Sequence, residues 1–297
     1  MAKVAILGST GMLGSCLTKF LENEVDELHE FNRSGTSITG RNKSSKFHIF
    51  KGIDLVDIFN EFKFDYIVNA TSFNSKNLKQ TNDYIESILL VNKYFLNELN
   101  NYSKKFKVPI IQISTDGVFS GKRGFYIESD LNDSNEMYGK SKLEGEKLGD
   151  VMMILRCSMI GKELTSCNSL LEWVLQQPKN AQISGYINHR WNGITTLHMS
   201  KIILGIIKFD GFKRGVYHVV PENSVNKNQL ISIILNEFNR LDVNVKSVNA
   251  PININRVLAT MYPENNLKLW SNAGYANLPY IEQMVKEFAE WSRNVET

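Results

Sequence analysis

Tyr138 and Lys142 lie four positions apart in the segment Tyr138-Gly139-Lys140-Ser141-Lys142. In a helix this spacing places the phenol and the ammonium on one face, a single turn apart. A free tyrosine has a pKa of about 10 and is a poor acid or base at neutral pH. A neighbouring ammonium is expected to lower that pKa toward the range in which acid–base catalysis works best. Such a pair can supply the proton that a ketone needs when it accepts a hydride.

Thr115 is the third candidate catalytic residue, because it ends the apolar run at 110–114. That run predicts a buried parallel strand, and ligands bind at the carboxyl edge of an open parallel sheet. The Thr115 hydroxyl is therefore expected to polarise a substrate carbonyl. Asp116 and Gly117, the next two residues, are expected to face the same substrate.

A glycine-rich turn near the N-terminus supplies a second signature, Gly8-Ser9-Thr10-Gly11-Met12-Leu13-Gly14. It follows an apolar run and precedes a helical pattern, which is the context that dinucleotide binding requires. The glycines allow a tight turn, a close approach of the backbone to a pyrophosphate, and close packing of helix on strand. The N–H groups at the start of the helix then bind the anion. We expect the turn, including Thr10, Met12 and Leu13, to contact a nicotinamide cofactor, which carries the hydride.

The residues after the second strand indicate which cofactor is bound. The run at 28–31 predicts that strand, and Asn32, Arg33 and Ser34 follow it without an acid that could hold a ribose hydroxyl. Arg33 can pair with a 2′-phosphate, so NADPH is favoured, with NADH as the alternative. Further cofactor contacts are expected where later strands end, at Asp54, Leu55, Asn69, Ala70 and Thr71.

Strand and helix patterns alternate over the first half of the chain. Apolar runs predict strands, and helical spacing follows at 84–99 and 138–148. This order predicts an α/β fold with a doubly wound parallel sheet of the Rossmann type. The pattern loosens after about residue 160. We therefore expect a dinucleotide-binding domain over 1–160 and a smaller, mainly substrate-binding lobe over 161–297, with some segments returning to the main sheet.

Composition excludes several classes of protein. The net charge is +3 over 297 residues, and Lys and Arg are spread out rather than gathered in the basic stripe of a nucleic-acid binder. No apolar run approaches the ~20 residues that span a bilayer, and Met1-Ala2-Lys3 leads directly into a strand. Cys16, Cys157 and Cys167 fit no zinc or redox spacing. We expect a reduced, cytoplasmic protein without a metal, a membrane or a nucleic acid as partner.

Five segments together resemble the extended short-chain dehydrogenase/reductases, and more closely the dTDP-4-dehydrorhamnose reductase family. They are the glycine-rich turn, Val68-Asn69-Ala70, Ser114-Thr115-Asp116-Gly117-Val118-Phe119, Tyr138-Gly139-Lys140-Ser141-Lys142-Leu143-Glu144-Gly145-Glu146 and Leu155-Arg156-Cys157-Ser158. The stretch Trp191-Asn192-Gly193-Ile194-Thr195-Thr196 is similar to the family's later, substrate-side segment.

This resemblance implies NAD(P)H-dependent reduction of the 4-keto group of a nucleotide-linked deoxysugar, in the biosynthesis of a surface polysaccharide or glycan. It implies Thr115, Tyr138 and Lys142 as the catalytic set, with Lys142 also holding the nicotinamide ribose. Trp191 and Arg256 are expected on the substrate side, where an arginine suits a diphosphate by its geometry. A homodimer is the expected assembly, since dimers are the commonest oligomers.

The chain departs from the family at three places. The family usually carries an aromatic residue where this chain has Gly117, and a histidine-containing stretch where it has Thr71-Ser72-Phe73-Asn74. Cys157 replaces a strand-end threonine. These changes leave the redox class intact, but loss of the aromatic would open the sugar pocket. They point to a sugar other than rhamnose, bulkier or amino-substituted.

Two other interpretations stay open. A sugar-nucleotide epimerase on the same fold would hold NAD tightly and recycle it, without net consumption. A non-catalytic regulatory subunit would bind the dinucleotide without turnover. A dehydratase is disfavoured, because Gly117 stands where the family of dehydratases usually has a glutamate.

Overall fold

The computed structural model describes residues 2–59, 61–73, 82–164 and 169–296, so Asn74 and Cys167 lie outside the described residues. A seven-stranded parallel sheet forms its centre, in the order β11-β6-β5-β4-β1-β2-β3. The strands are β1 (Lys3–Leu7), β2 (Glu27–Asn32), β3 (Lys43–Lys46), β4 (Tyr66–Asn69), β5 (Ile110–Thr115), β6 (Met153–Cys157) and β11 (Gly215–His218).

The central strands are buried along nearly their whole length, as a sheet covered on both faces requires. The strand order reverses direction between β1 and β4. Ligands of open α/β sheets bind in the crevice beyond the carboxyl ends of the strands at such a point. The expected doubly wound fold is confirmed, and it places the ligand crevice beside the glycine-rich turn.

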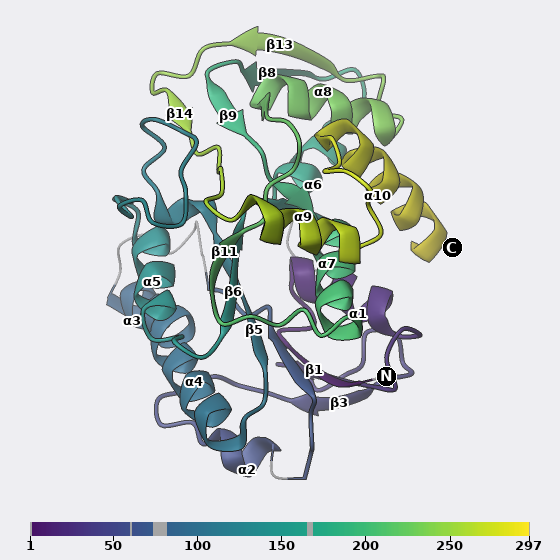
Figure 1. Cartoon of the computed structure of the whole chain (residues 1–297). Helices are drawn as coiled ribbons and strands as arrows, with labels where there is room; N and C mark the ends of the chain where they lie inside the picture. The colour runs from purple at the N-terminus through teal and green to yellow at the C-terminus, as the bar shows by residue number, and fades with distance from the viewer. Residues whose placement is uncertain (1, 60, 74–81, 165–168, 297) are drawn as a thin grey trace.

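Helices cover both faces of the sheet (Figure 1). One face carries α1 (Met12–Leu21) and α7 (Thr196–Lys208), which pack against each other. The other face carries α2 (Leu55–Phe59), α3 (Asn82–Leu89), α4 (Phe95–Phe106) and α5 (Met137–Glu146). A π-helical turn, Leu90–Tyr94, joins α3 to α4. The single helix expected at 84–99 is thus longer than predicted and contains an irregular turn.

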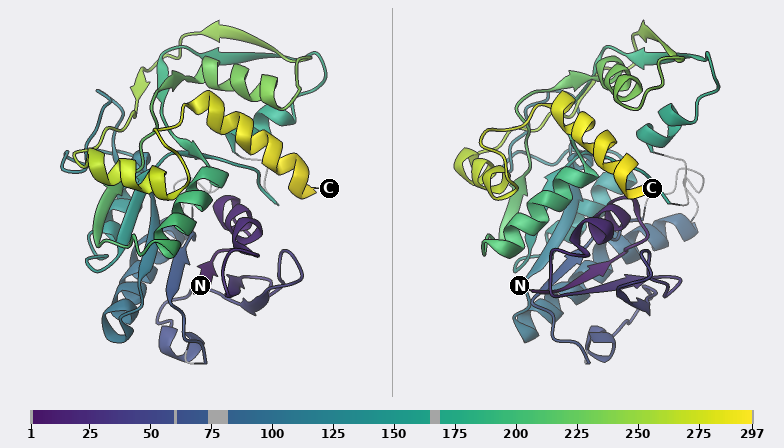
Figure 2. Two further views of the ribbon diagram at one scale, coloured as in Figure 1. Left: turned by 45° about the vertical axis from the view of Figure 1, so that its right-hand side comes forward. Right: turned by 90° about the vertical axis from the view of Figure 1, so that its right-hand side faces the viewer.

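The second half of the chain builds a smaller lobe at the carboxyl end of the sheet (Figure 2). It contains the parallel pair β8 (Gln182–Tyr186) and β13 (Asn244–Val248), and the three-stranded sheet β12 (Val225–Asn226), β9 (His189–Trp191) and β14 (Ile254–Asn255). Its helices are α6 (Leu170–Leu175), α8 (Lys227–Glu237), α9 (Pro263–Asn272) and α10 (Ile281–Glu296). The short strand β7 (Met159–Ile160), at the end of the first half, pairs in parallel with β10 (Ile194–Thr195) of the second half. β11 comes from this half and joins the main sheet beside β6.

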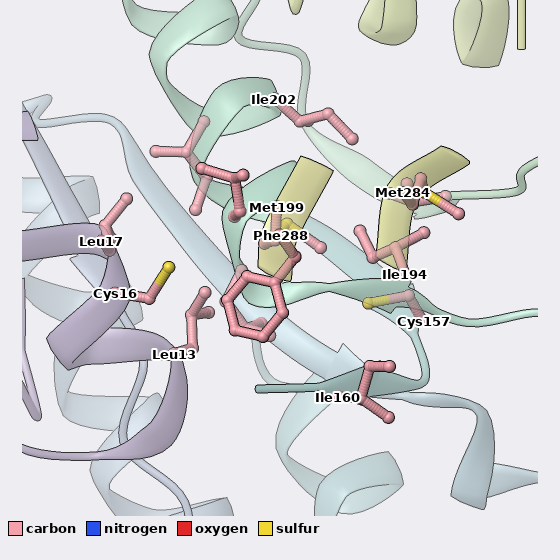
Figure 3. Packing of buried hydrophobic residues seen from close by; sticks show 14 of the residues in the cluster. Leu13, Cys16, Leu17, Cys157, Ile160, Ile194, Met199, Ile202, Met284 and Phe288 are labelled. Carbon is pink, nitrogen blue, oxygen red and sulfur yellow. The ribbon is translucent and has the colours of Figure 1, made fainter. Parts of the chain in front are cut away.

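Helix α10 packs back onto the first half of the chain. Figure 3 shows Leu13 and Cys16 of α1, Met199 of α7 and Phe288 of α10 turned toward one apolar core. Phe288 is 1% exposed, and the thiols of Cys16 and Cys157 are buried and unbonded to each other. None of the helices in the described part of the chain has the length and apolar character needed to cross a bilayer.

Candidate active site

The glycine-rich turn joins β1 to α1 through contacts that require glycine. Gly8 has a φ of +82°, and its N–H donates to the Phe31 carbonyl at 2.8 Å. A Cβ on Gly14 would lie 2.1 Å from the Gly8 carbonyl oxygen, so α1 can approach the turn only without a side chain there. The α1 N-terminus has no side-chain cap and no acid in its first turn. It therefore fits the pyrophosphate of a dinucleotide.

Asn32 organises the loop after β2. Its buried Nδ2 donates to the Ser9 hydroxyl at 2.9 Å and to the Thr36 carbonyl at 3.0 Å. Its Oδ1 accepts hydrogen bonds from the backbone and hydroxyl of Ser34 and from the backbone of Gly35. Every bonding position of the amide is thus used inside the protein, and the expected contact of Asn32 with a cofactor stays a prediction.

Arg33 and Ser34 are exposed beside that ordered loop. Because Asn32 and Gly35 fix the loop, the Arg33 guanidinium starts from a defined backbone position. Its positive charge suits a 2′-phosphate.

Two further predicted cofactor residues have structural roles. The Leu55 side chain is 3% exposed and belongs to the aromatic-rich core under the sheet. Asn69 is fully buried; its Nδ2 donates to Gln112 Oε1 at 2.6 Å, and its Oδ1 accepts from the backbone and hydroxyl of Thr71. Both side chains thus have structural roles, with Asn69 shaping the segment that follows it, and their expected proximity to a cofactor stays a prediction.

Ala70, Thr71 and Asp54 lie nearer the surface. The Ala70 N–H donates to the Leu7 carbonyl at 3.0 Å. Thr71 packs on Gly8, where an added Cβ would lie 3.1 Å from Thr71 Cγ2. Ala70 and Thr71 thus border the glycine-rich turn. Asp54 is exposed and its Oδ1 accepts the Val56 N–H at 2.7 Å at the start of α2.

Thr115 and Tyr138 meet at the carboxyl end of β5. The first turn of α5 rests directly on the short turn Asp116–Val118, since a Cβ on Gly139 would lie 2.0 Å from the Gly117 carbonyl oxygen. A Cβ on Gly117 would lie 3.2 Å from Thr115 Oγ1 and 3.7 Å from Tyr138 Cδ1. Gly117 therefore packs closely against both side chains.

The Tyr138 phenol differs from its expected state. Burial raises its pKa above the usual value, and the nearby charge of Asp116 adds to this effect. Hydrogen bonds with Ser72, whose hydroxyl is 3.4 Å from the phenolic oxygen, and with Thr115 lower the pKa in part. The predicted lowering by Lys142 is wrong for this structure, because burial is the larger influence.

Lys142 lies one turn further along α5, and its side chain is buried. Its Nζ donates to the Ile113 carbonyl at 2.8 Å. Burial lowers the pKa of Lys142 to about 8, and the charge of Glu146 opposes this. Glu146 is held in turn by Arg156, whose Nε lies 3.0 Å from Oε1. The Lys142 ammonium is therefore held in a fixed position near the buried ion pair of Glu146 and Arg156.

Asn92 is a positioning residue that the sequence did not reveal. It lies in the π-helical turn, and its Nδ2 donates to the Phe73 carbonyl at 3.1 Å and to the Ser141 hydroxyl at 3.0 Å. Its Oδ1 accepts the Phe73 N–H at 3.1 Å. Asn92 thus ties the segment after β4 to the catalytic helix α5. π-Helical turns are frequent at functional sites.

The expected substrate-side residues lie at the rim of this site. Trp191 is 4% exposed and its indole N–H donates to Ser158 Oγ at 2.8 Å, so it offers no donor to a ligand. Arg256 donates from Nε to the Phe119 carbonyl at 3.0 Å and pairs through Nη2 with Glu136. Burial raises the pKa of Asp116, while the charges of Arg256 and Lys227 act in the opposite direction. Lys227 was not predicted, because a lone lysine at the start of a helix gives no sequence signal.

Comparison with known proteins identifies the family to which the chain belongs. A family model described as the RmlD substrate binding domain matches residues 2–288. The chain belongs to this family. It is 31% identical over 237 residues to a dTDP-4-dehydrorhamnose reductase of Aggregatibacter actinomycetemcomitans, and the match covers 76% of each chain.

Solved structures share the fold over nearly the whole chain. A dTDP-4-dehydrorhamnose reductase from Bacillus anthracis str. Ames in complex with NADP superposes with a TM-score of 0.76 at 20% identity, covering 100% of this chain and 99% of that chain. MoeE5 in complex with UDP-glucuronic acid and NAD gives 0.74 at 17% identity, covering 98% and 99%. At these identities the similarity establishes the fold.

Proposed function

We propose that this protein is an NADPH-dependent reductase of the 4-keto group of a nucleotide-linked deoxysugar, acting in the biosynthesis of a surface polysaccharide or glycan. The observation that carries the proposal is the placement of Thr115, Tyr138 and Lys142 at the carboxyl end of β5, beside the glycine-rich turn. Membership of the RmlD family and the similarity to a named reductase support it.

The residues divide the chemistry between them. Thr115 orients the substrate carbonyl through its hydroxyl, and Tyr138 donates the proton to the oxygen. A phenol whose pKa is raised stays protonated at neutral pH, which suits the acid in a reduction. The Lys142 ammonium supplies positive charge one turn away and holds the ribose of the nicotinamide. The nicotinamide supplies the hydride when it is bound.

The chain's own residues support NADPH as the cofactor, with NADH as the alternative. The uncapped start of α1 would hold the pyrophosphate, and exposed Arg33 would pair with the 2′-phosphate. The B. anthracis reductase was solved with NADP and MoeE5 with NAD, so both cofactors occur on this fold.

In this proposal, Gly117 favours a substrate sugar other than rhamnose. A side chain at this position would start in contact with both catalytic residues, because its Cβ would lie 3.2 Å from Thr115 Oγ1 and 3.7 Å from Tyr138 Cδ1. Its absence leaves room for a bulkier or amino-substituted sugar.

Turnover tests the proposal directly. NADPH loss is followed with a panel of dTDP-, UDP-, CDP- and GDP-linked 4-keto-6-deoxysugars, with the Tyr138→Phe variant as control. Turnover of one sugar that is lost in the variant, while NADPH binding is retained, is the expected result. Conversion of a sugar nucleotide without net NADPH loss would indicate an epimerase. Tight NADPH binding without conversion of any sugar would favour the regulatory subunit.

A further inference from the structure

Lys227 is a charged side chain at the rim of the active site whose position its own protein contacts do not explain. Its ammonium lies 5.4 Å from the centre of the Trp191 ring. Among the residues that the structure describes, no hydrogen bond or ion pair holds this ammonium. The side chain is half-buried, and the three donors of the ammonium remain available to a ligand at this rim.

The local electrostatics make this position unfavourable for a lysine. Lys227 is the first residue of α8, next to the N-cap Asn226. A helix N-terminus carries partial positive charge and favours anions over cations. Burial lowers the pKa of Lys227 to about 8; the charge of Asp116 opposes this shift, and the charge of Arg256 adds to it. Asp116 offsets these effects only in part, so the position points to an anionic ligand.

The strand arrangement shows where that ligand would lie. In the small sheet β12-β9-β14, β12 and β14 are the two neighbours of β9, which ends at Trp191. β12 runs antiparallel to β9, with Val225 opposite Trp191, and the Lys227 ammonium lies over the Trp191 ring. β14 runs parallel to β9 on its other side, and Arg256 follows Asn255, which lies opposite Arg190. Lys227 and Arg256 both interact with Asp116, which follows the catalytic Thr115. An anion between these cations is thus adjacent to the reacting carbonyl.

The two cations differ in what they can offer. Arg256 is already engaged, by the Phe119 carbonyl and by Glu136. Lys227 keeps its donors for a ligand. The Trp191 ring, held by the hydrogen bond of its indole N–H to Ser158, presents its face to the Lys227 ammonium.

We propose that Lys227 is a substrate-positioning residue that binds the diphosphate of the nucleotide sugar, with Arg256 as the second cation of that subsite. The inference rests on the proposed function, because it assumes a nucleotide-linked substrate. It assigns the diphosphate to the rim between β12 and β14 and leaves Thr115, Tyr138 and Lys142 to the sugar.

Ligand binding to the NADPH-loaded protein tests this assignment. We would titrate it calorimetrically with dTDP and UDP, and with thymidine and uridine as probes that lack phosphate. Lys227→Met keeps an unbranched side chain and removes the charge. Loss of a charge-assisted hydrogen bond should weaken diphosphate binding roughly 10- to 100-fold. Nucleoside and NADPH affinities should not change.

Two further variants serve as controls. Lys227→Arg should restore most of the diphosphate affinity. Lys246→Met removes the same charge from an exposed position on β13 of the same lobe and should change nothing.

The pH dependence gives a readout that a purely structural lysine would not produce. The charged groups that face Lys227 are Asp116 and Arg256. With a pKa of about 8, the ammonium loses its proton between pH 7 and 9, so wild-type diphosphate affinity should fall over that range. The Lys227→Arg variant should show a much smaller fall.

The outcomes separate this inference from the proposed function. Diphosphate binding by Lys227→Met as tight as by wild type would overturn the inference and leave the reductase proposal intact. Equal losses of nucleoside and diphosphate binding would also overturn it, because they indicate a structural role. Failure of the wild-type protein to bind any nucleoside diphosphate would overturn the inference and the nucleotide-linked substrate with it.

Discussion

Replacing Lys142 by methionine should make the protein more stable at neutral pH while it removes activity. The side chain is buried, and burial lowers its pKa from an ordinary value of 10.5 to about 8. At about 1.4 kcal/mol for each pH unit, that difference corresponds to about 3 kcal/mol of destabilisation of the folded state near pH 7.

The variant also loses one hydrogen bond, so the two effects must be compared. The Ile113 carbonyl that accepts from Lys142 also accepts from Gln112 Nε2 at 2.6 Å. It is therefore not left without a donor, and the loss should cost only about 1 kcal/mol. The net expectation is that the free energy of unfolding of Lys142→Met exceeds that of the wild type by about 2 kcal/mol at pH 7.

The sign of the pH dependence follows from proton binding. Between pH 8 and 10.5 the unfolded chain still binds the lysine proton that the folded protein has released. Wild-type stability should therefore rise with pH, and the advantage of the variant should shrink by about 3 kcal/mol between pH 7 and 10.5. Tyrosine ionisation affects both proteins alike and cancels in the difference.

Urea unfolding, followed by tryptophan fluorescence, measures this difference. Lys140→Met, which removes a charge from the exposed face of the same helix, is the matched control. A difference between wild type and Lys142→Met that stays constant from pH 7 to 10.5 would refute the reasoning. It would mean that the ammonium is not desolvated in the folded protein.

Two predictions concern the cofactor. Gly14→Ala places a Cβ 2.1 Å from the Gly8 carbonyl oxygen, so the turn must shift. We expect NADPH affinity, measured by fluorescence titration, to fall at least about 10-fold. Unchanged affinity would show that the turn does not hold the pyrophosphate. Arg33→Ala should weaken NADPH binding about 10- to 100-fold and leave NADH binding unchanged, because only NADPH offers the 2′-phosphate. Equal losses for both cofactors would contradict the assigned role of Arg33.

Much of the main sheet could be predicted because most of its strands are apolar and are followed by turn residues. β1 contains the aliphatic run Val4-Ala5-Ile6-Leu7 and β5 contains three isoleucines, and such apolar segments identify buried parallel strands. The glycine-rich turn and the Tyr138–Lys142 spacing carry their chemistry in local sequence, so both could be recognised without a structure. The second half offered less, because β9, β12 and β14 have only two or three residues each, too few for a periodic pattern.

Side-chain direction at the site could not be predicted from local sequence, for one physical reason. A position near a strand end does not reveal whether the side chain faces the ligand crevice or the protein. Asn32, Leu55 and Asn69 all follow or end expected elements, yet their side chains bond or pack inward. Burial likewise decides the pKa of Tyr138, and burial depends on residues distant in sequence. Asn92 and Lys227 act through contacts across the fold that no local motif encodes.

Isotope transfer is the most direct test of the central claim. The protein would be incubated with NADPH that carries deuterium at the transferable position of the nicotinamide and with the 4-keto-6-deoxysugar nucleotide found in the turnover panel. The account predicts one deuterium bound to carbon 4 of the product sugar, matched by an equal amount of NADP formed, and neither in the Tyr138→Phe variant. Product without deuterium at carbon 4, or with hydrogen taken from solvent at a neighbouring carbon, would contradict it.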